Sequence, residues 1–232
     1  EVALNAHADI AAFWKANEPT FYQIQEAAQK AGDFEAEEKA RMKRESLMKT
    51  YDLVEQNYKP LILRLQNLRV PTVAMVNGVA AGAGASLALA CDLVIAGKSA
   101  SFLQAFSKIG LIPDTGGTWF LPQRVGMARA MGLALLADKL PAEKAAEWGL
   151  IWQVVDDAEL GVTVDALAKQ LAGMPTKALV RTRQAMHAAP MHTLEQQLSM
   201  EGGFMRELGW SPDFAEGVAA FMEKRAPRFT GN

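Results

Sequence analysis

Asp114 is the acidic residue whose setting in the sequence best suits proton transfer. It lies in the segment FSKIGLIPDTGGTWFLP, residues 106–122, directly before a pair of glycines. Apolar residues surround it in the sequence, and we expect Ile112, Trp119 and Phe120 to desolvate its carboxyl group in part. A partly desolvated carboxyl group can take up a proton and return it. The alternative is a structural role, in which Asp114 caps the N-terminus of the helix that follows.

A second segment, NGVAAGAGASL at residues 77–87, could hold a negative charge. Small side chains let a ligand approach the backbone, and the first N–H groups of a helix have no partner inside it. Together with the helix dipole, these N–H groups can bind an anion or a developing oxyanion. The alternative is that the small residues only allow a helix and a strand to pack closely.

The elements that must position these segments predict an α/β fold. The pattern reads strand, turn, helix and strand, at Val70–Val76, Asn77–Gly78, Gly82–Ala90 and Leu93–Ala96 in that order. Alternation of strands and helices at this spacing indicates parallel strands joined by crossover connections.

Helical patterns flank this α/β segment on both sides. Ahead of it, a charged stretch at 33–46 predicts a solvated helix. Apolar residues spaced three and four apart from Leu47 to Leu68 then predict a helix that packs on a core, with a kink at Pro60. After the α/β segment, helices are predicted at 166–171, 177–188, 193–208 and 214–224. Thr193 is expected to be the N-cap of the third of these.

Composition excludes several classes of protein. The 232 residues are 50% hydrophobic and 22% charged, as in soluble globular proteins, and no apolar run reaches the ~20 residues that cross a membrane. A net charge of −2 argues against a dedicated nucleic-acid partner. The single cysteine, Cys91, excludes an internal disulfide and fits a reducing compartment. It is expected in the core, as are Trp148 and Trp152. His187 and His192 lack metal-ligand spacing, so no metal site is expected.

The two chemistry-bearing segments together resemble the crotonase (enoyl-CoA hydratase/isomerase) superfamily. The resemblance covers Ala6–Asn232 and is most specific over Pro71–Asp156. Within the superfamily, the segments FSKIGLIPDTGGTWFLP, GMARAMGLALL, AAEWGLIWQVVDD and EGVAAFMEKRAPRFTG are similar to the phenylacetate-pathway ring-epoxide isomerases. The resemblance implies an α/β fold, with a crotonase-type ββα spiral core over residues 1–160. A C-terminal helical trimerisation region would follow over residues 161–232.

The resemblance also implies roles at the reacting carbon. The family stabilises a thioester enolate with two backbone N–H groups, which fall here on Ala8 and Ala83. The two water-activating glutamates of the family's hydratases match Ser86 and Phe106, which cannot do that work. The acidic residue typical of its isomerases matches Asp114. The resemblance therefore favours isomerisation, with Asp114 as the catalytic acid/base, over the addition of water.

Contacts to coenzyme A follow from the same resemblance. The matching positions for substrate and coenzyme A contacts include Ala6, Asp9, Ile10, Gly82 and Gly117. On the last helix, often that of a neighbouring subunit, Phe221 and Lys224 match positions that contact the adenine and the phosphates. An ordinary exposed lysine is the alternative for Lys224. His7 replaces the customary glycine beside the oxyanion donor, where it either fills space or assists proton transfer.

The function implied by the resemblance is isomerisation of an acyl-CoA through a thioester enolate. The expected substrate is 2-(1,2-epoxy-1,2-dihydrophenyl)acetyl-CoA, which is converted to its oxepin form in phenylacetate catabolism. The alternatives are Δ3-Δ2-enoyl-CoA isomerisation in fatty acid metabolism, thioester hydrolysis, and a non-catalytic or RNA-binding homologue. No cofactor is expected apart from the coenzyme A of the substrate. A cytoplasmic homotrimer or dimer of trimers is expected, without a nucleic-acid or membrane partner.

Two departures from the family pattern lie near the start of the sequence. Only five residues precede Ala6, so the strands that normally come first are expected to be missing. Ala8 and Ala83 lie 75 positions apart (83 − 8), more than is usual in the family, and the extra length falls in a helical insert at about 18–50. This stretch normally borders the acyl pocket, so we hypothesise an extended lid over the acyl group.

Overall fold

The computed structural model describes residues 34–232. Contacts divide the chain into two compact units, Glu1–Tyr58 and Lys59–Asn232. The predicted boundary at residue 160 lies inside the second unit and stays a prediction. Five residues to which the sequence assigns a role lie outside the described residues: Ala6, His7, Ala8, Asp9 and Ile10.

In the first unit, the charged stretch forms the helix α2 (Phe34–Leu53), followed by the π-helical turn η1 (Val54–Tyr58). The predicted helix is thereby confirmed. Glu38 and Arg41 form an exposed ion pair with 4.0 Å between Oε1 and Nη2, a contact of small energetic weight. The π-helical turn comes just ahead of Pro60, whose ring nitrogen has no N–H to continue an α-helical ladder. The hypothesis that the insert forms a lid stays a prediction.

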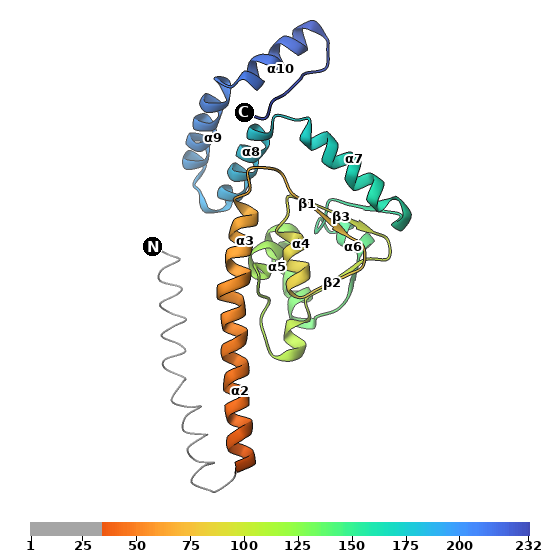
Figure 1. Cartoon of the computed structure of the whole chain (residues 1–232), viewed down its shortest axis with the longest axis vertical. Coiled ribbons are helices and arrows are strands. Elements are labelled where there is room, and N and C mark those ends of the chain that lie inside the picture. Colours follow the sequence, from red (N-terminus) through yellow and green to blue (C-terminus); the bar gives the residue numbers. More distant parts are fainter. Residues whose placement is uncertain (1–33) are drawn as a thin grey trace. The chain divides into compact units, whose positions relative to one another are not determined.

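The second unit holds two small sheets (Figure 1). In sheet A all strands are parallel, in the order β1 (Val73–Val76), β3 (Leu93–Gly97) and β6 (Gln153–Val155). In sheet B the order is β2 (Val79–Ala81), β4 (Ser101–Leu103) and β5 (Leu140–Pro141). β2 runs parallel to β4, whereas β5 runs antiparallel to it. The predicted parallel pairing is confirmed. The antiparallel β4–β5 pair was not predicted, because a two-residue strand leaves no pattern in the sequence.

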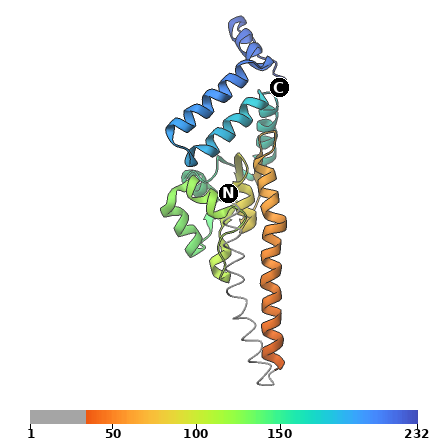
Figure 2. The same ribbon diagram turned by 90° about the vertical axis from the view of Figure 1, so that its left-hand side faces the viewer.

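Helices pack on these sheets and continue beyond them (Figures 1 and 2). In chain order they are α3 (Lys59–Gln66), α4 (Ala83–Leu89), α5 (Gly117–Leu136), α6 (Ala142–Glu147), α7 (Leu160–Ala172), α8 (Thr176–Ala188), α9 (Leu194–Gly209) and α10 (Pro212–Glu223), with short 3-10 turns η2 (Ala105–Ile109), η3 (Asp157–Glu159) and η4 (Ala189–Met191). α7 lies on sheet A, while α8, α9 and α10 extend away from the strands in both views. The four helices predicted after residue 160 are confirmed as α7 to α10. No helix within residues 34–232 is long and apolar enough to cross a membrane.

Local sequence signals account for the start of α9. The hydroxyl of Thr193 accepts the N–H of Gln196 at 3.3 Å, and the side-chain oxygen of Gln196 accepts the N–H of Thr193 at 2.9 Å. This reciprocal capping box satisfies two N–H groups that the helix itself leaves without acceptors. The predicted N-cap is confirmed.

The core of the second unit lies where α4, α5 and α6 meet the strands. Its least exposed large side chains are Leu89, Val94, Ile95 and Leu150. From α3, Ile62 and Leu65 pack partly against this core. Of these two, only Leu65 belongs to the predicted apolar stripe, and two other members of it, Leu61 and Leu68, are 47% and 36% exposed. The face of α3 that packs on the core therefore differs in part from the predicted one.

The two tryptophans expected in the core behave differently. Trp148 packs partly against the core, and the guanidinium of Arg129 lies 5.0 Å from the centre of its ring. Trp152 is 66% exposed, so the prediction of a core position is wrong for it. Its backbone N–H donates to Val94 O at 3.0 Å, beside sheet A, and hydrophobicity alone does not tell which face the side chain takes.

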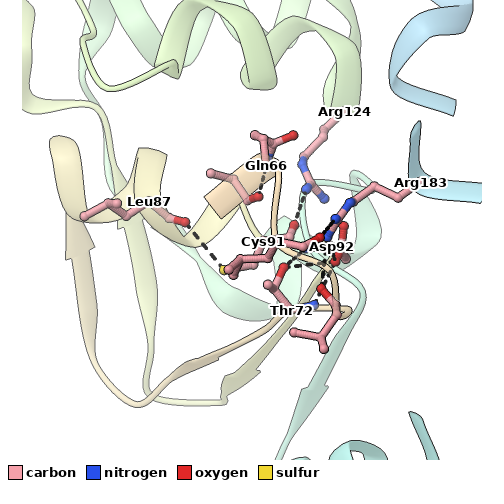
Figure 3. Close-up of polar contacts among 10 residues, drawn as sticks. Gln66, Thr72, Leu87, Cys91, Asp92, Arg124 and Arg183 are labelled. Atoms are coloured by element: carbon pink, nitrogen blue, oxygen red, sulfur yellow. Dashed lines mark hydrogen bonds and ion pairs between the residues drawn. The ribbon is translucent and has the colours of Figure 1, made fainter. Parts of the chain in front are cut away.

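A buried polar network ties α8 to sheet A (Figure 3). Arg183 is 8% exposed, and its Nη1 lies 3.1 Å from Oδ2 of Asp92. The same guanidinium donates to the carbonyl oxygens of Leu68 and Val70. Thr72 donates to Asp92 twice, from its backbone N–H at 2.7 Å and from its hydroxyl at 3.0 Å. The network joins residues 91 positions apart in the sequence.

The carboxyl end of α4 is closed by side chains from other helices (Figure 3). Nη2 of Arg124 donates to Leu89 O at 2.7 Å and to Cys91 O at 2.9 Å, and burial lowers the pKa of this guanidinium. Nε2 of Gln66 donates to Ala90 O at 2.5 Å. Cys91 itself is half-buried rather than in the core, and burial raises the pKa of its thiol.

Hydrogen bonds hold the last residues of the chain against α10. Asp213 is 4% exposed and accepts the backbone N–H groups of Thr230 at 2.7 Å and Gly231 at 2.8 Å, and the Thr230 hydroxyl at 3.0 Å. Burial acts to raise the pKa of Asp213, but these hydrogen bonds outweigh it and hold that pKa below its ordinary range. Glu216 accepts two hydrogen bonds from Arg225, at 2.6 and 2.9 Å, which contribute most to lowering the pKa of Glu216 to about 2.

Candidate active site

The two segments singled out in the sequence meet at one edge of sheet B. After β2 the chain passes through Gly82 into α4, and after β4 it passes through Gln104 into η2. β2 and β4 are parallel neighbours, so both connections leave the sheet at its carboxyl edge. A 2.8 Å hydrogen bond from the Gly82 N–H to Leu103 O joins them. In folds of parallel strands, ligands bind outside this edge.

The entry into α4 depends on a glycine. Gly82 has φ 53° and ψ −124°, backbone angles that residues with a Cβ avoid. The ring of Phe106 lies 3.5 Å from the place where a Cβ would stand. Ala83 is then the first residue of α4, so its N–H is one of those that find no acceptor within the helix. This position suits an oxyanion donor, and the role of Ala83 stays a prediction.

A second glycine brings α5 against α4. A Cβ on Gly117 would stand 2.8 Å from Oγ of Ser86 and 3.0 Å from Cβ of Pro113, closer than side chains approach one another. Gly117 is buried at the first position of α5. Its lack of a side chain lets the turn that carries Asp114 lie next to α4, which gives Gly117 a packing role besides the predicted ligand contact.

Asp114 lies in a tight turn ahead of α5. The N–H of Gly117 donates to Asp114 O at 2.8 Å, and the two residues between them, Thr115 and Gly116, have left-handed φ angles of 55° and 82°. This pattern is typical of a type I′ turn. The N-cap of α5 is Gly116, and no side chain caps the helix. The alternative reading of Asp114 as a helix cap is therefore wrong, because the turn places it too far before the helix.

The surroundings of the Asp114 carboxyl group are only partly those predicted. The side chain is half-buried, and its Oδ1 accepts the Thr115 hydroxyl at 2.9 Å. Phe120 is buried as expected, but Ile112 and Trp119 are 76% and 47% exposed. The predicted enclosure by all three is wrong, because Ile112 and Trp119 keep much of their surface open to solvent. Nowhere in residues 34–232 do three His, Cys, Asp or Glu side chains gather as metal ligands would.

The positions matched to the water-activating glutamates hold buried, non-acidic side chains. Ser86 is fully buried, and among residues 34–232 its hydroxyl reaches only Gly82 O, at 3.5 Å. Phe106 is 7% exposed. Gln104, two residues before Phe106, was not predicted from the sequence. It is 4% exposed, and its Oε1 has no hydrogen-bond partner in the described part of the chain. A polar residue directly after a buried strand was the signal available for it.

Phe221 and Lys224 do not join this cluster within the chain. Both lie at the end of α10, far from α4 and α5 in both views (Figures 1 and 2). Phe221 is 82% exposed and lines an apolar groove of about 530 Å³ together with Phe214 and Phe229. Lys224 is exposed at the C-cap, with a left-handed φ of 54°. A role for these two residues at Asp114 would need a second copy of the chain.

Comparison with known proteins identifies the family to which this chain belongs. The profile described as Enoyl-CoA hydratase/isomerase matches residues 32–232, most of the chain. The chain belongs to the enoyl-CoA hydratase/isomerase family. The match begins after residues 6–10, so it neither includes nor tests the predicted oxyanion motif there.

Named relatives of this family lie close in sequence and structure. The 1,2-epoxyphenylacetyl-CoA isomerase of Escherichia coli (strain K12) is 56% identical over 178 residues, which is 77% of this chain and 68% of that protein. A Rhodobacter capsulatus protein with the name "Probable enoyl-CoA hydratase" is 51% identical over 77% of this chain and 70% of its own. A solved enoyl-CoA hydratase from Polaromonas sp. JS666 superposes with a TM-score of 0.76 at 30% identity, over 83% of this chain and 75% of that one. The predicted superfamily and fold are confirmed, and the chain is an enzyme of this family.

Proposed function

We propose that this enzyme isomerises an acyl-CoA through a thioester enolate, with 1,2-epoxyphenylacetyl-CoA as its substrate. One observation carries the proposal: the turn that carries Asp114 lies beside α4, while Ser86 and Phe106 leave the water-activating positions without a carboxyl group. The name of the E. coli relative supports the choice of substrate. The fatty-acid reaction on a Δ3-enoyl-CoA needs the same proton transfer and is the second candidate.

The proposed mechanism uses one proton and two backbone donors. The N–H groups of Ala83 and Ala8 stabilise the negative charge that develops on the thioester oxygen when an α-proton leaves. Asp114 accepts that proton and returns it to another carbon, so the product has the composition of the substrate. Addition of water would need a second ionisable group to activate the water, and neither Ser86 nor Phe106 supplies one.

Binding of the coenzyme A part completes the proposal. Ala6, Asp9, Ile10, Gly82 and Gly117 would contact the substrate near the thioester. Phe221 and Lys224 would reach the adenine and phosphates of a substrate held by a neighbouring copy, because α10 is remote from α4 and α5 within one chain. We propose a homotrimer or a dimer of trimers as the assembly that brings the neighbouring copy into place. We also propose that the enzyme is cytoplasmic and that it needs no cofactor other than the coenzyme A of its substrate.

The substitution Asp114→Asn tests the mechanism. Asparagine keeps the size of the side chain and cannot carry the proton, so kcat should fall about 100- to 10,000-fold while KM stays within about threefold. Asp138→Asn is the matched control, because Asp138 is an exposed aspartate just after α5. Activity of Asp114→Asn within tenfold of wild type would contradict the assignment.

A substrate panel tests the reaction. The wild-type enzyme should convert the aromatic epoxide faster than a 3-enoyl-CoA and should add no water to a 2-enoyl-CoA. Faster turnover of the 3-enoyl-CoA would favour the second candidate. Release of free coenzyme A would indicate thioester hydrolysis, and a 3-hydroxyacyl-CoA product would indicate a hydratase.

A further inference from the structure

Among the described residues, Thr115 alone makes a side-chain hydrogen bond to the Asp114 carboxylate. Thr115 follows Asp114 in the chain and donates its hydroxyl to Oδ1 over 2.9 Å. Thr115 is 6% exposed, so water competes poorly for this hydroxyl. Hydrogen bonds to ionised groups are stronger than those between neutral groups. The contact therefore restrains the direction of the carboxyl group.

The backbone of Thr115 adopts a costly conformation where it makes this contact. Its φ of 55° lies in the left-handed region, which β-branched residues rarely enter. Glycine or asparagine meets the needs of such a turn more easily, and the next residue in the turn is Gly116. Strained residues of this kind persist where their surroundings fix them, and they gather at functional sites. Since the turn itself does not require threonine, we attribute the presence of threonine at this strained position to its side chain.

The hydrogen bond assigns different work to the two carboxylate oxygens. Oδ1 accepts from Thr115, which leaves Oδ2 to exchange a proton with the substrate. When Oδ2 carries the proton, Oδ1 is a carbonyl oxygen and still accepts the same hydrogen bond. The direction of the carboxyl group is thus kept through both halves of the reaction.

We propose that Thr115 is a positioning residue, which holds the Asp114 carboxyl group so that Oδ2 faces the α-carbon of the thioester. This inference rests on the proposed function, in which Asp114 carries the proton. A threonine that only shapes the turn would affect the stability of the fold. A positioning residue affects turnover and leaves binding of the thioester unchanged.

Three variants separate these roles. Thr115→Val keeps the branched shape and loses the donor, Thr115→Ser keeps the donor, and Thr115→Gly loses the donor while it relieves the left-handed strain. We expect kcat to fall about 10- to 100-fold in the valine and glycine variants, with KM within about twofold, while serine stays within about threefold of wild type. The glycine variant should unfold at an equal or higher temperature than wild type, so its activity and its stability change in opposite directions.

Each variant is measured in two assays. One follows the aromatic epoxide, and the other follows exchange of the α-protons of phenylacetyl-CoA for deuterium in D₂O by mass spectrometry. In the exchange, the α-proton passes to Asp114, is replaced from solvent and returns as deuterium to the same carbon. The exchange needs the enolate and Asp114 but not the epoxide chemistry.

The outcomes distinguish the two proposals. Exchange without epoxide isomerisation in the wild type overturns the proposed substrate, while the role of Thr115 is then read from the exchange rates. Wild-type exchange rates in the valine and glycine variants overturn the role of Thr115, as does a serine variant that fails like valine. Turnover that follows the melting temperature across the three variants also overturns it, and absence of exchange in the wild type overturns both proposals.

Discussion

At the residue scale, the turn through Thr115 and Gly116 holds Asp114 ahead of α5 and gives its carboxyl group one side-chain donor among the described residues. The segment around Asp114 signals a turn before a helix, and resemblance to a family points to the acid. The left-handed φ of Thr115 leaves no sequence signal, because threonine seldom adopts it. Thr115 and Gly116 form the turn ahead of α5, whose N-cap is Gly116, and Ile112 and Trp119 are exposed. A prediction based on neighbours in the sequence cannot anticipate such a reversal.

A pH-dependent prediction also belongs to this scale. The pKa of Asp213 is lowered in the folded chain because its carboxylate accepts hydrogen bonds from Thr230 and Gly231. Protonation therefore favours release of the tail, so docking is complete above the ordinary aspartate pKa of about 4 and is lost as pH falls through the lower folded value. Asp213→Asn should release the tail at pH 7.

Hydrogen exchange of the Thr230 and Gly231 amides, corrected for the intrinsic rate at each pH, measures this release. Wild type should begin to lose protection below about pH 4 and lose the rest as pH falls through the lower folded pKa, and the asparagine variant should lack protection throughout. Full protection of both amides in the variant at pH 7 would show that the charge is not what holds the tail.

At the element scale, α4 illustrates how a short helix is kept in place by its neighbours. It has seven residues, too few to be stable alone. Its entry is tied to β4 through Gly82, and its exit carbonyls are satisfied by Gln66 and Arg124 (Figure 3). The sequence predicts α4 itself from its small residues and the longer helices from their apolar spacing. The short strands β2, β4 and β5 went unpredicted, because two or three residues cannot display a period.

Removal of the Arg124 guanidinium should destabilise the fold through α4. In Arg124→Met, the carbonyl groups of Leu89 and Cys91 lose a charged donor in a partly buried place, which we expect to cost about 2–3 kcal/mol in free energy of unfolding. Urea denaturation measures the loss. Arg129→Met is the control on the same helix, since exposed Arg129 contacts the Trp148 ring and should cost about 0.5–1 kcal/mol. Equal losses in both variants would contradict a special role for the α4 exit.

At the scale of the whole molecule, long-range polar contacts lie beyond prediction from one sequence. Family resemblance anticipated the fold, because its motifs keep their order and spacing. No pattern linked Asp92 to Arg183, which are 91 positions apart. Their partners are backbone carbonyls and Thr72, whose places depend on the completed fold. Such a contact is found only once the sheet and α8 have been brought together.

Removing the charge of Asp92 while Arg183 stays buried should lower the stability of the fold. Asp92→Asn leaves the buried Arg183 guanidinium without its counter-charge, so the free energy of unfolding should fall by about 3 kcal/mol. Glu147→Gln is the matched control. Its partner Lys144 is even closer, at 2.7 Å against 3.1 Å for Asp92 and Arg183, but both side chains are exposed, so we expect a loss of under about 1 kcal/mol. Urea denaturation of both variants provides the measurement, and an Asp92→Asn loss as small as the control would refute a stabilising network.

The half-buried position of Cys91 makes the alkylation rate of its thiol a measure of opening at the C-terminal end of α4. Its Sγ lies 3.8 Å from Leu87 O, and burial raises the pKa of the thiol, so little thiolate is present at neutral pH. Alkylating reagents attack the thiolate, so labelling waits for the moments when this corner of the molecule opens. Because the sequence holds one cysteine, each labelled chain gains a single mass increment. The rate of that gain reports how often the C-terminal end of α4, the end away from Ala83, comes apart.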